Sequence, residues 1–103
     1  MVAAGEDHSV ALTHAGEVWT CGDNLYGQLG DGTTTQRSRP VQVMTGTSTA
    51  LSGVVQIAAG GSTACARLTT GSVMCWGANT NGTVGDNTTT QRTRPVQVSG
   101  LTA

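Results

Sequence analysis

The chain has 103 residues and a formal net charge of −1, and its three aromatic residues are Trp19, Tyr26 and Trp76. Its basic residues are five arginines without a lysine, which argues against a nucleic-acid or anionic-membrane surface, since either needs a basic excess. No stretch of 18 apolar residues is present that could span a bilayer. Because so few large side chains bury little area, we expect stability to depend on a partner surface, a disulfide or both.

The chain consists of two copies of one sequence repeat. Residues 2–43 align without a gap on residues 57–98, at a constant offset of 55. Periods of about fifty residues are typical of propellers and solenoids. We therefore divide the chain into a first repeat (1–43), a linker with an insertion (44–56), a second repeat (57–98) and a tail (99–103) in phase with the start of a repeat.

Each repeat contains four short segments with the composition of strands. In the first repeat they are residues 2–4, 8–13, 17–21 and 41–43, with a long Gly-, Asn- and Thr-rich loop at 22–40. Their counterparts are residues 57–59, 64–68, 72–76 and 96–98. No window has the i, i+3, i+4, i+7 spacing of an amphipathic helix. The pattern predicts an all-β fold with two four-stranded antiparallel β-propeller blades. A parallel β-helix is a weaker alternative, because its rungs are much shorter than this period.

The long loop of each repeat contains an aspartate followed after one residue by three threonines, which suits a turn closed by hydrogen bonds from side chains to the backbone. Two arginines follow the threonines and could bind a ligand. We favour a structural role, in which an arginine pairs with the loop aspartate or with loop carbonyls. The residues concerned are Asp31, Arg37 and Arg39 in the first repeat, and Asp86, Arg92 and Arg94 in the second.

Cys65 and Cys75 flank a predicted hairpin in the second repeat. If residues 69–71 form a three-residue turn with Gly71 left-handed, the two cysteines lie directly opposite each other. Opposed positions place Cβ atoms roughly 4.5–5.5 Å apart, slightly beyond the spacing of a disulfide but within reach of a local adjustment. A disulfide and a pair of reduced buried thiols both remain open. Cys21 is expected to be a small core residue.

Three groups of residues carry a family resemblance: Gly5-x-x-His8, Gly22-x-Asn24-x-x-Gly27-Gln28-Leu29-Gly30 and Pro40-Val41. The chain resembles the regulator-of-chromosome-condensation repeat, and the cysteine pair with the Gly-Asp-(Gly/Asn)-Thr-Thr-Thr loop is most similar to bacterial members. The resemblance implies four-stranded blades, usually seven in a closed ring, that present loops to other proteins. Members include a guanine-nucleotide exchange factor and a photoreceptor, but this chain lacks the extra loop of the former and the tryptophan cluster of the latter.

Two repeats leave the outer faces of both blades uncovered. Our leading hypothesis is a non-enzymatic scaffold, natural or engineered, that self-assembles into a closed homo-oligomeric propeller. Three copies would supply six blades and four copies eight, whereas whole chains cannot supply seven. The alternative is a ligand- or protein-binding module from a larger, seven-bladed natural protein.

A candidate binding site lies in the first repeat. Glu6, Asp7 and His8 are replaced by Gly-Ser-Thr in the second repeat, so the blade does not require them. Together with Tyr26 of the long loop they could contact a ligand, although a solvated rim loop is the simpler interpretation. The three cysteines and two histidines match no zinc pattern, and no catalytic spacing is present. We expect no enzyme activity, cofactor or metal, and as partners a further copy of the chain or another protein.

Overall fold

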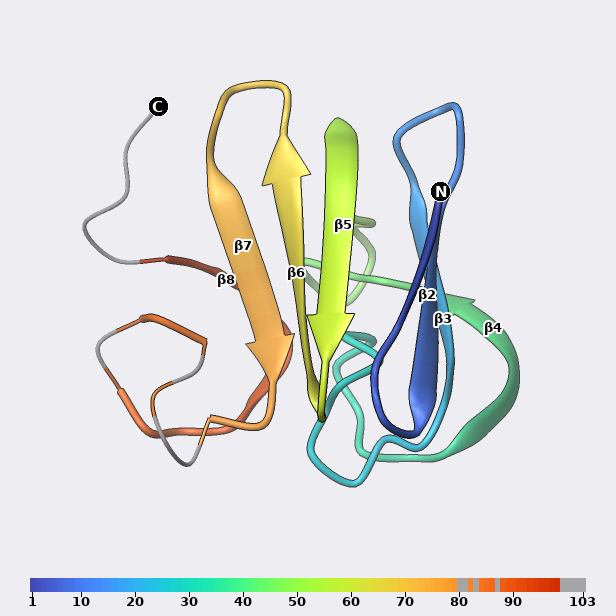
Figure 1. Ribbon diagram of the computed structural model, residues 1–103, viewed down its shortest axis with the longest axis vertical. Coiled ribbons are helices and arrows are strands. Elements are labelled where there is room, and N and C mark those ends of the chain that lie inside the picture. Colours follow the sequence, from blue (N-terminus) through green and yellow to red (C-terminus); the bar gives the residue numbers. More distant parts are fainter. Residues whose placement is uncertain (80–81, 83, 87, 99–103) are drawn as a thin grey trace.

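The computed structural model describes residues 1–79, 82, 84–86 and 88–98. It contains two four-stranded antiparallel sheets, here called blade 1 and blade 2, with strand orders β1-β2-β3-β4 and β5-β6-β7-β8 (Figure 1). Blade 1 consists of β1 (Val2–Ala4), β2 (His8–Leu12), β3 (Val18–Gly22) and β4 (Arg37–Gln42). Blade 2 consists of β5 (Val54–Gly60), β6 (Thr63–Leu68), β7 (Val73–Gly77) and β8 (Arg92–Gln97). The prediction of an all-β fold with one antiparallel sheet per repeat is confirmed.

Tight glycine turns close the central hairpin of each blade. Gly16 between β2 and β3 has φ 80°, and Gly71 between β6 and β7 has φ 90°. A side chain would be strained in this left-handed region, so glycine is the residue that the turn requires. The Leu68 N–H donates to the carbonyl of Ser72 at 2.9 Å, which places the turn where the sequence predicts it.

The last strand of each blade begins earlier than predicted. β4 starts at Arg37 and β8 at Arg92, within the segments that the sequence assigns to the long loops. The pairing of β3 with β4 changes register between Thr20 and Gly22. Such a bulge tolerates residues that cannot donate to the ladder, so Pro40 can lie inside a strand that has no further neighbour.

The hydrophobic core lies between the two blades. Successive side chains of a strand point to opposite faces, and one face of each sheet supplies the core. Val10 and Val18 belong to the same buried cluster as Ile57 and Trp76, with β5 lying beside β1 and β2. The other cluster members are Val43, Leu51, Val54, Ala64 and Ala66. Neither blade therefore has a core of its own.

The long loop after β3 also connects the blades. The indole Nε1 of Trp76 donates to the Gln28 carbonyl at 2.9 Å, and the Gly32 N–H donates to the Thr93 carbonyl at 2.9 Å. A Cβ on Gly27 would lie 2.8 Å from the Cα of Thr93, so this approach requires glycine. The loop of blade 1 is thereby packed onto β7 and β8 of blade 2.

The first strand of blade 2 also begins earlier than predicted. β5 begins at Val54, three residues before the start of the second repeat predicted at residue 57. Met44 and Ala50 form an isolated bridge within the predicted linker. The predicted tail, residues 99–103, lies outside the described residues. Among the residues that the structure describes, no helix has the length and hydropathy needed to span a bilayer.

Candidate functional site

The loops at one end of the blades contain three of the four residues predicted to bind a ligand, Glu6, Asp7 and Tyr26. In Figure 1 the β1–β2 turn, the β5–β6 turn and the long loop after β3 lie at the lower end of the sheets. The β2–β3 and β6–β7 turns lie at the opposite end. We call the lower end the loop face.

Asn24 is the centre of the long loop in blade 1 and is completely buried. Its amide nitrogen donates to the carbonyls of Thr33 and Thr35, both at 3.0 Å, and its amide oxygen accepts the N–H of Leu29 at 3.0 Å. In blade 2 the Asn79 nitrogen donates to the Thr90 carbonyl, and its amide oxygen accepts the N–H of Val84, both at 2.9 Å. One side chain thus holds three points of the loop together, which makes the loop a fixed part of the blade.

Each long loop also contains one ion pair. The Arg37 Nε lies 3.2 Å from Asp31 Oδ2, and the Arg92 Nε lies 2.6 Å from Asp86 Oδ2. Both aspartates are nearly buried, with side chains 8% and 9% exposed. These are the contacts expected of a structural arginine–aspartate pair.

The surroundings of both aspartates favour the charged carboxylate. Burial raises the pKa of Asp31, but hydrogen bonds from the Thr33 hydroxyl and N–H, supported by its paired arginine, lower it below the ordinary 3.8. The Thr88 hydroxyl, which donates to Asp86 at 2.6 Å, is the largest cause that lowers the pKa of Asp86 to about 2. Both loops are therefore held by charged carboxylates at neutral pH.

The second arginine of each predicted set behaves differently. Arg94 lies under the loop of blade 1, with its guanidinium 2.7 Å from the position that a Cβ on Gly32 would take. Its Nε is buried without a hydrogen-bond partner. The equivalent Arg39 is exposed, and neither arginine pairs with a loop aspartate in the described part of the chain. The role of these two residues differs because a loop covers blade 2 at this point and none covers blade 1.

The tip of the long loop of blade 1 presents two apolar side chains to solvent. Leu25 is 62% exposed and Tyr26 is 42% exposed. The Tyr26 N–H donates to the Gln28 side chain at 2.9 Å, and the Leu25 N–H lies 3.4 Å from a carboxylate oxygen of Asp23. The two side chains project outward from a backbone that hydrogen bonds keep in place.

The β1–β2 turn lies beside this loop. The Asp23 N–H donates to the Asp7 carbonyl at 3.0 Å, and the Glu6 N–H donates to the Gly61 carbonyl of blade 2 at 2.9 Å. Glu6 and Asp7 are exposed. Of the four predicted binding residues, the structure thus brings Glu6 and Asp7 to the base of the loop that carries Tyr26.

His8 differs from the other predicted residues because its ring is buried and only 4% exposed. It shares the inner face of the strand with Val10, and its ring contacts the backbone of Gly5, where a Cβ would lie 2.2 Å from Cε1. Neither ring nitrogen has a hydrogen-bond partner. Burial lowers the pKa of His8, and the charges of Asp23 and Asp7 only partly offset this. His8 is therefore a neutral side chain beneath the surface, and does not present its ring to a ligand.

We define the loop platform as Glu6, Asp7, Asp23, Leu25 and Tyr26. Asp23 and Leu25 were missed in the sequence analysis, although a signal was available: their counterparts in the second repeat are Ala78 and Thr80. Within the described ranges, no three His, Cys, Asp or Glu residues are grouped closely enough to hold a metal ion. The platform is a surface with separated charges and an apolar tip, which is suited to a contact rather than to chelation.

Comparisons with known proteins identify the family of the repeat. The model of the regulator of chromosome condensation (RCC1) repeat matches residues 15–67, and a second RCC1 repeat model matches residues 54–83. The chain belongs to the RCC1 repeat family. Residues 15–67 begin in the turn before β3 and end in β6, so one RCC1 repeat spans the junction between two blades.

The curated relatives of this RCC1 chain include large ubiquitin ligases. The chain is 37% identical over 101 residues to the E3 ubiquitin-protein ligase HERC2 of Homo sapiens, which is 97% of this chain and 2% of that protein. It is 38% identical over 99 residues to the probable E3 ubiquitin-protein ligase HERC4 of Homo sapiens, 96% of this chain and 9% of that protein. The matched region is a small share of either protein and consists of RCC1 repeats. The match therefore relates the blades of this chain to those repeats and says nothing about ligase activity.

Solved structures share the RCC1 blade arrangement. Human WBSCR16 superposes with a TM-score of 0.76 and 35% identity, covering 95% of this chain and 24% of that chain. Yeast RCC1 (Prp20), crystallised with Kap60, superposes with a TM-score of 0.78 and 24% identity, covering 96% and 22%. The two blades thus correspond to about a quarter of a complete RCC1-type chain.

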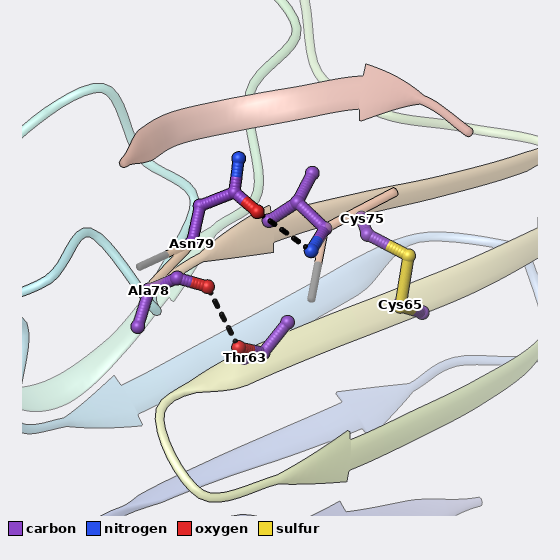
Figure 2. Close-up of a disulfide and its surroundings, with 6 residues drawn as sticks. Thr63, Cys65, Cys75, Ala78 and Asn79 are labelled. Atoms are coloured by element: carbon purple, nitrogen blue, oxygen red, sulfur yellow. Dashed lines mark hydrogen bonds between the residues drawn. A yellow bond between two sulfur atoms is a disulfide. The ribbon is translucent and has the colours of Figure 1, made fainter. Parts of the chain in front are cut away.

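The outer face of blade 2 in this RCC1 chain carries a disulfide. Cys65 and Cys75 are joined by it, with their Cα atoms 4.1 Å apart, and Figure 2 shows the bond beside the contact of Thr63 with Ala78. Hollows of about 230 and 140 Å³ lie on both sides of Cys65, and Ala58 lines both. Cys21, the free cysteine, is half-buried opposite Ser9 on the outer face of blade 1 and does not lie in the described core.

Proposed function

We propose that the chain forms two adjacent blades of a larger, non-catalytic RCC1-type propeller and binds another protein through the loop platform of blade 1. The comparisons favour this module over our leading hypothesis of a self-assembling scaffold, because the RCC1 proteins it resembles are about four times as long. In such a propeller, further blades would cover the outer faces of blades 1 and 2.

The observation that carries the proposal is the difference between the two repeats. Both loops share the central asparagine (Asn24 and Asn79), three glycines and the Asp–Arg pair. The platform residues are all different, with Gly61, Ser62, Ala78, Thr80 and Asn81 at the corresponding positions of the second repeat. Both repeats form the same blade with different side chains at these five positions, so the blade fold does not require the platform residues. Its exposed leucine and tyrosine are unfavourable in water, and a protein contact would offset that cost.

Proteins with this fold support a role in protein binding. Yeast RCC1 (Prp20) has been crystallised bound to Kap60, and Prp20p of Saccharomyces cerevisiae has been described with its binding to Gsp1p and histones. Those partners belong to those proteins. What supports the present proposal is the shared way of presenting loops at one end of a set of blades.

The second repeat supplies a matched control for the test. Leu25→Thr and Tyr26→Asn give blade 1 the loop tip of the second repeat, which is compatible with the same loop framework. Phage-displayed random peptides would be selected on the wild-type chain and rescreened on the L25T/Y26N variant. We expect peptides that bind the wild type and lose binding to the variant, while the thermal unfolding curve is unchanged. Failure to recover any peptide sensitive to these substitutions would contradict the proposal.

Self-assembly remains a second candidate function, favoured by the uncovered outer faces. On blade 1 this face includes Ala4, Ala11 and Cys21, and on blade 2 it includes Ala58 beside the hollows. In a closed propeller each blade has a neighbour on both of its faces, so either outer face could accept another copy of the chain. Sedimentation equilibrium decides the matter: a mass three or four times that of one chain supports a ring, and a folded monomer at micromolar concentration excludes it.

A further inference from the structure

We infer that the partner of the loop platform is a basic, extended polypeptide segment with an apolar side chain between its positive charges. This inference rests on the proposed function and specifies its partner. It is carried by three observations: the carboxylates of the platform are unpaired, the nearby histidine does not neutralise them, and an apolar tip lies beside them.

The first observation concerns the distribution of charge. The chain has six acidic residues, and two of them, Asp31 and Asp86, are paired with arginines. Glu17 lies near the β2–β3 turn, at the opposite end of the blade. The remaining three are Glu6, Asp7 and Asp23 of the platform, and none forms a salt bridge in the described part of the chain. Apart from Glu17, the carboxylates that no arginine pairs with in the described part of the chain therefore belong to the loop platform.

The second observation is the position of His8 beneath these carboxylates. Asp23 and Asp7 are the charged groups that act on its ring, yet the ring is 4% exposed and both nitrogens lack a partner. An imidazole in this position remains neutral at pH 7, since burial disfavours its charged form. His8 thus leaves the negative charge of Asp7 and Asp23 for an external cation.

The third observation is the apolar tip. Leu25 and Tyr26 are exposed on a loop whose backbone is fixed by Asn24, so a partner would not need to order them. The exposed ring of Tyr26 can also accept a guanidinium over its face. Side chains of this kind are enriched at the centres of protein interfaces, whereas the carboxylates suit the rim.

These features together select the class of partner. Nucleic acids and anionic membranes carry the same sign of charge as the platform and would be repelled. A metal ion needs several ligands converging on one point, and the described residues offer no such group. A basic polypeptide can instead place separate arginines against the carboxylates and an apolar side chain against Leu25 and Tyr26.

The test uses three fluorescent synthetic peptides and the full chain. The first alternates arginine with leucine, the second replaces each arginine by glutamine, and the third replaces each leucine by glycine. Fluorescence anisotropy would measure their binding to the wild type and to the E6Q/D7N/D23N variant, which keeps the shape and hydrogen-bonding capacity of the side chains. We expect the first peptide to bind best, and to bind the variant about tenfold more weakly, which is roughly 1.4 kcal/mol. The affinity should fall as salt is raised, because exposed charges are screened.

Glu17→Gln is the matched control, since it removes one carboxylate far from the platform, and it should leave binding unchanged. A free-energy loss in the control of about one third of that in E6Q/D7N/D23N would overturn the inference, because binding would then follow the number of carboxylates removed and not their position. Equal binding of the glutamine peptide, or binding of a labelled DNA oligonucleotide, would overturn the partner class. If peptides selected on the chain still depend on Leu25 and Tyr26 in that case, the proposed function stands while this inference fails.

Discussion

Equivalent positions of the two blades have the same sequence pattern and opposite environments. Trp76 and Pro95 of blade 2 are buried, because the long loop of blade 1 and its β-sheet cover them. Their counterparts in blade 1 are Cys21, which is half-buried, and Pro40, which is exposed. The difference shows that the structural unit of stability is the junction between blades, not the blade itself. A repeat contributes one side of a core, and its neighbour contributes the other.

The largest expected effect comes from removing the centre of the junction. Trp76→Ala should destabilise the chain by about 3–5 kcal/mol, because it empties a fully buried site and removes the hydrogen bond to Gln28. Trp19→Ala, on the outer face of blade 1, should cost about 1.5 kcal/mol or less. Urea unfolding followed by circular dichroism measures both. Equal losses would show that blade 1 has a core independent of the junction.

Loss of the disulfide should have the next largest effect on stability, and blade 1 shows which residues can take the place of the two cysteines. Cys65→Val with Cys75→Thr gives blade 2 the residues Val10 and Thr20 of blade 1. With the cysteines at a sequence separation of 10, loss of the crosslink should cost roughly 3 kcal/mol through the entropy of the unfolded chain. The wild type in a reducing agent should unfold at about the temperature of the variant, and the variant should not respond to the agent. A reducing agent without effect on the wild type would contradict this.

The asparagines of the two loops should differ, because only one of these loops has a neighbouring blade to contact. Asn24→Ala should cost about 2 kcal/mol, since it frees several loop groups that pack against blade 2. Asn79→Ala breaks the bonds to Thr90 and Val84 in a loop whose described residues make no hydrogen bond to blade 1, and should cost less. Thermal unfolding of the two variants, compared directly, tests the difference. A larger loss for Asn79→Ala would reverse the order of importance of the loops.

The smallest expected effect is a dependence of stability on pH through His8. The pKa of His8 in the folded chain is below its ordinary 6.5, so the folded state binds fewer protons than the unfolded state. The stability that neutral His8 contributes to the folded chain is therefore fully present above pH 6.5. It is lost as the pH falls through the lower pKa that His8 has in the folded state. His8→Thr, which inserts the residue of the second repeat, should remove this slope in denaturant titrations between pH 7 and 5. Asp31 and Asp86 act at lower pH, below 3.8, and should leave this range unaffected.

Much of the fold follows from the sequence because each repeat satisfies local rules independently. Turn glycines such as Gly71 and the short alternating strands depend on near neighbours in the chain, so the hairpins were predictable. The start of β4 was not, since Arg37 joins the sheet only through a bulge whose register depends on the opposite strand. The same limit applies to Arg94, whose guanidinium lies against Gly32 of the other blade and does not pair with an aspartate of its own loop in the described part of the chain.

The candidate site was only partly predictable. Comparison of the repeats indicated Glu6 and Asp7, whose exposure agrees with a surface role. It also indicated His8, which differs between the repeats for a reason of packing, since its ring lies on the inner face of the strand. Asp23 joined the site only when a backbone hydrogen bond placed it beside Asp7. A difference between repeats shows where the fold is permissive, whereas exposure shows which of these positions a partner can reach.

The sequence by itself determined the repeat, the all-β blades and the positions of the hairpin turns. These depend on residues close in the chain or on a pattern that occurs twice. The tertiary structure decided which face of each blade is covered, that the core lies between the blades, and that the β1–β2 turn lies beside the long loop after β3. These depend on contacts between segments distant in the chain, such as the 48-residue separation between Gln28 and Trp76. Interactions between residues close in the chain form the blades, and the packing of one blade on the next decides which residues stay exposed.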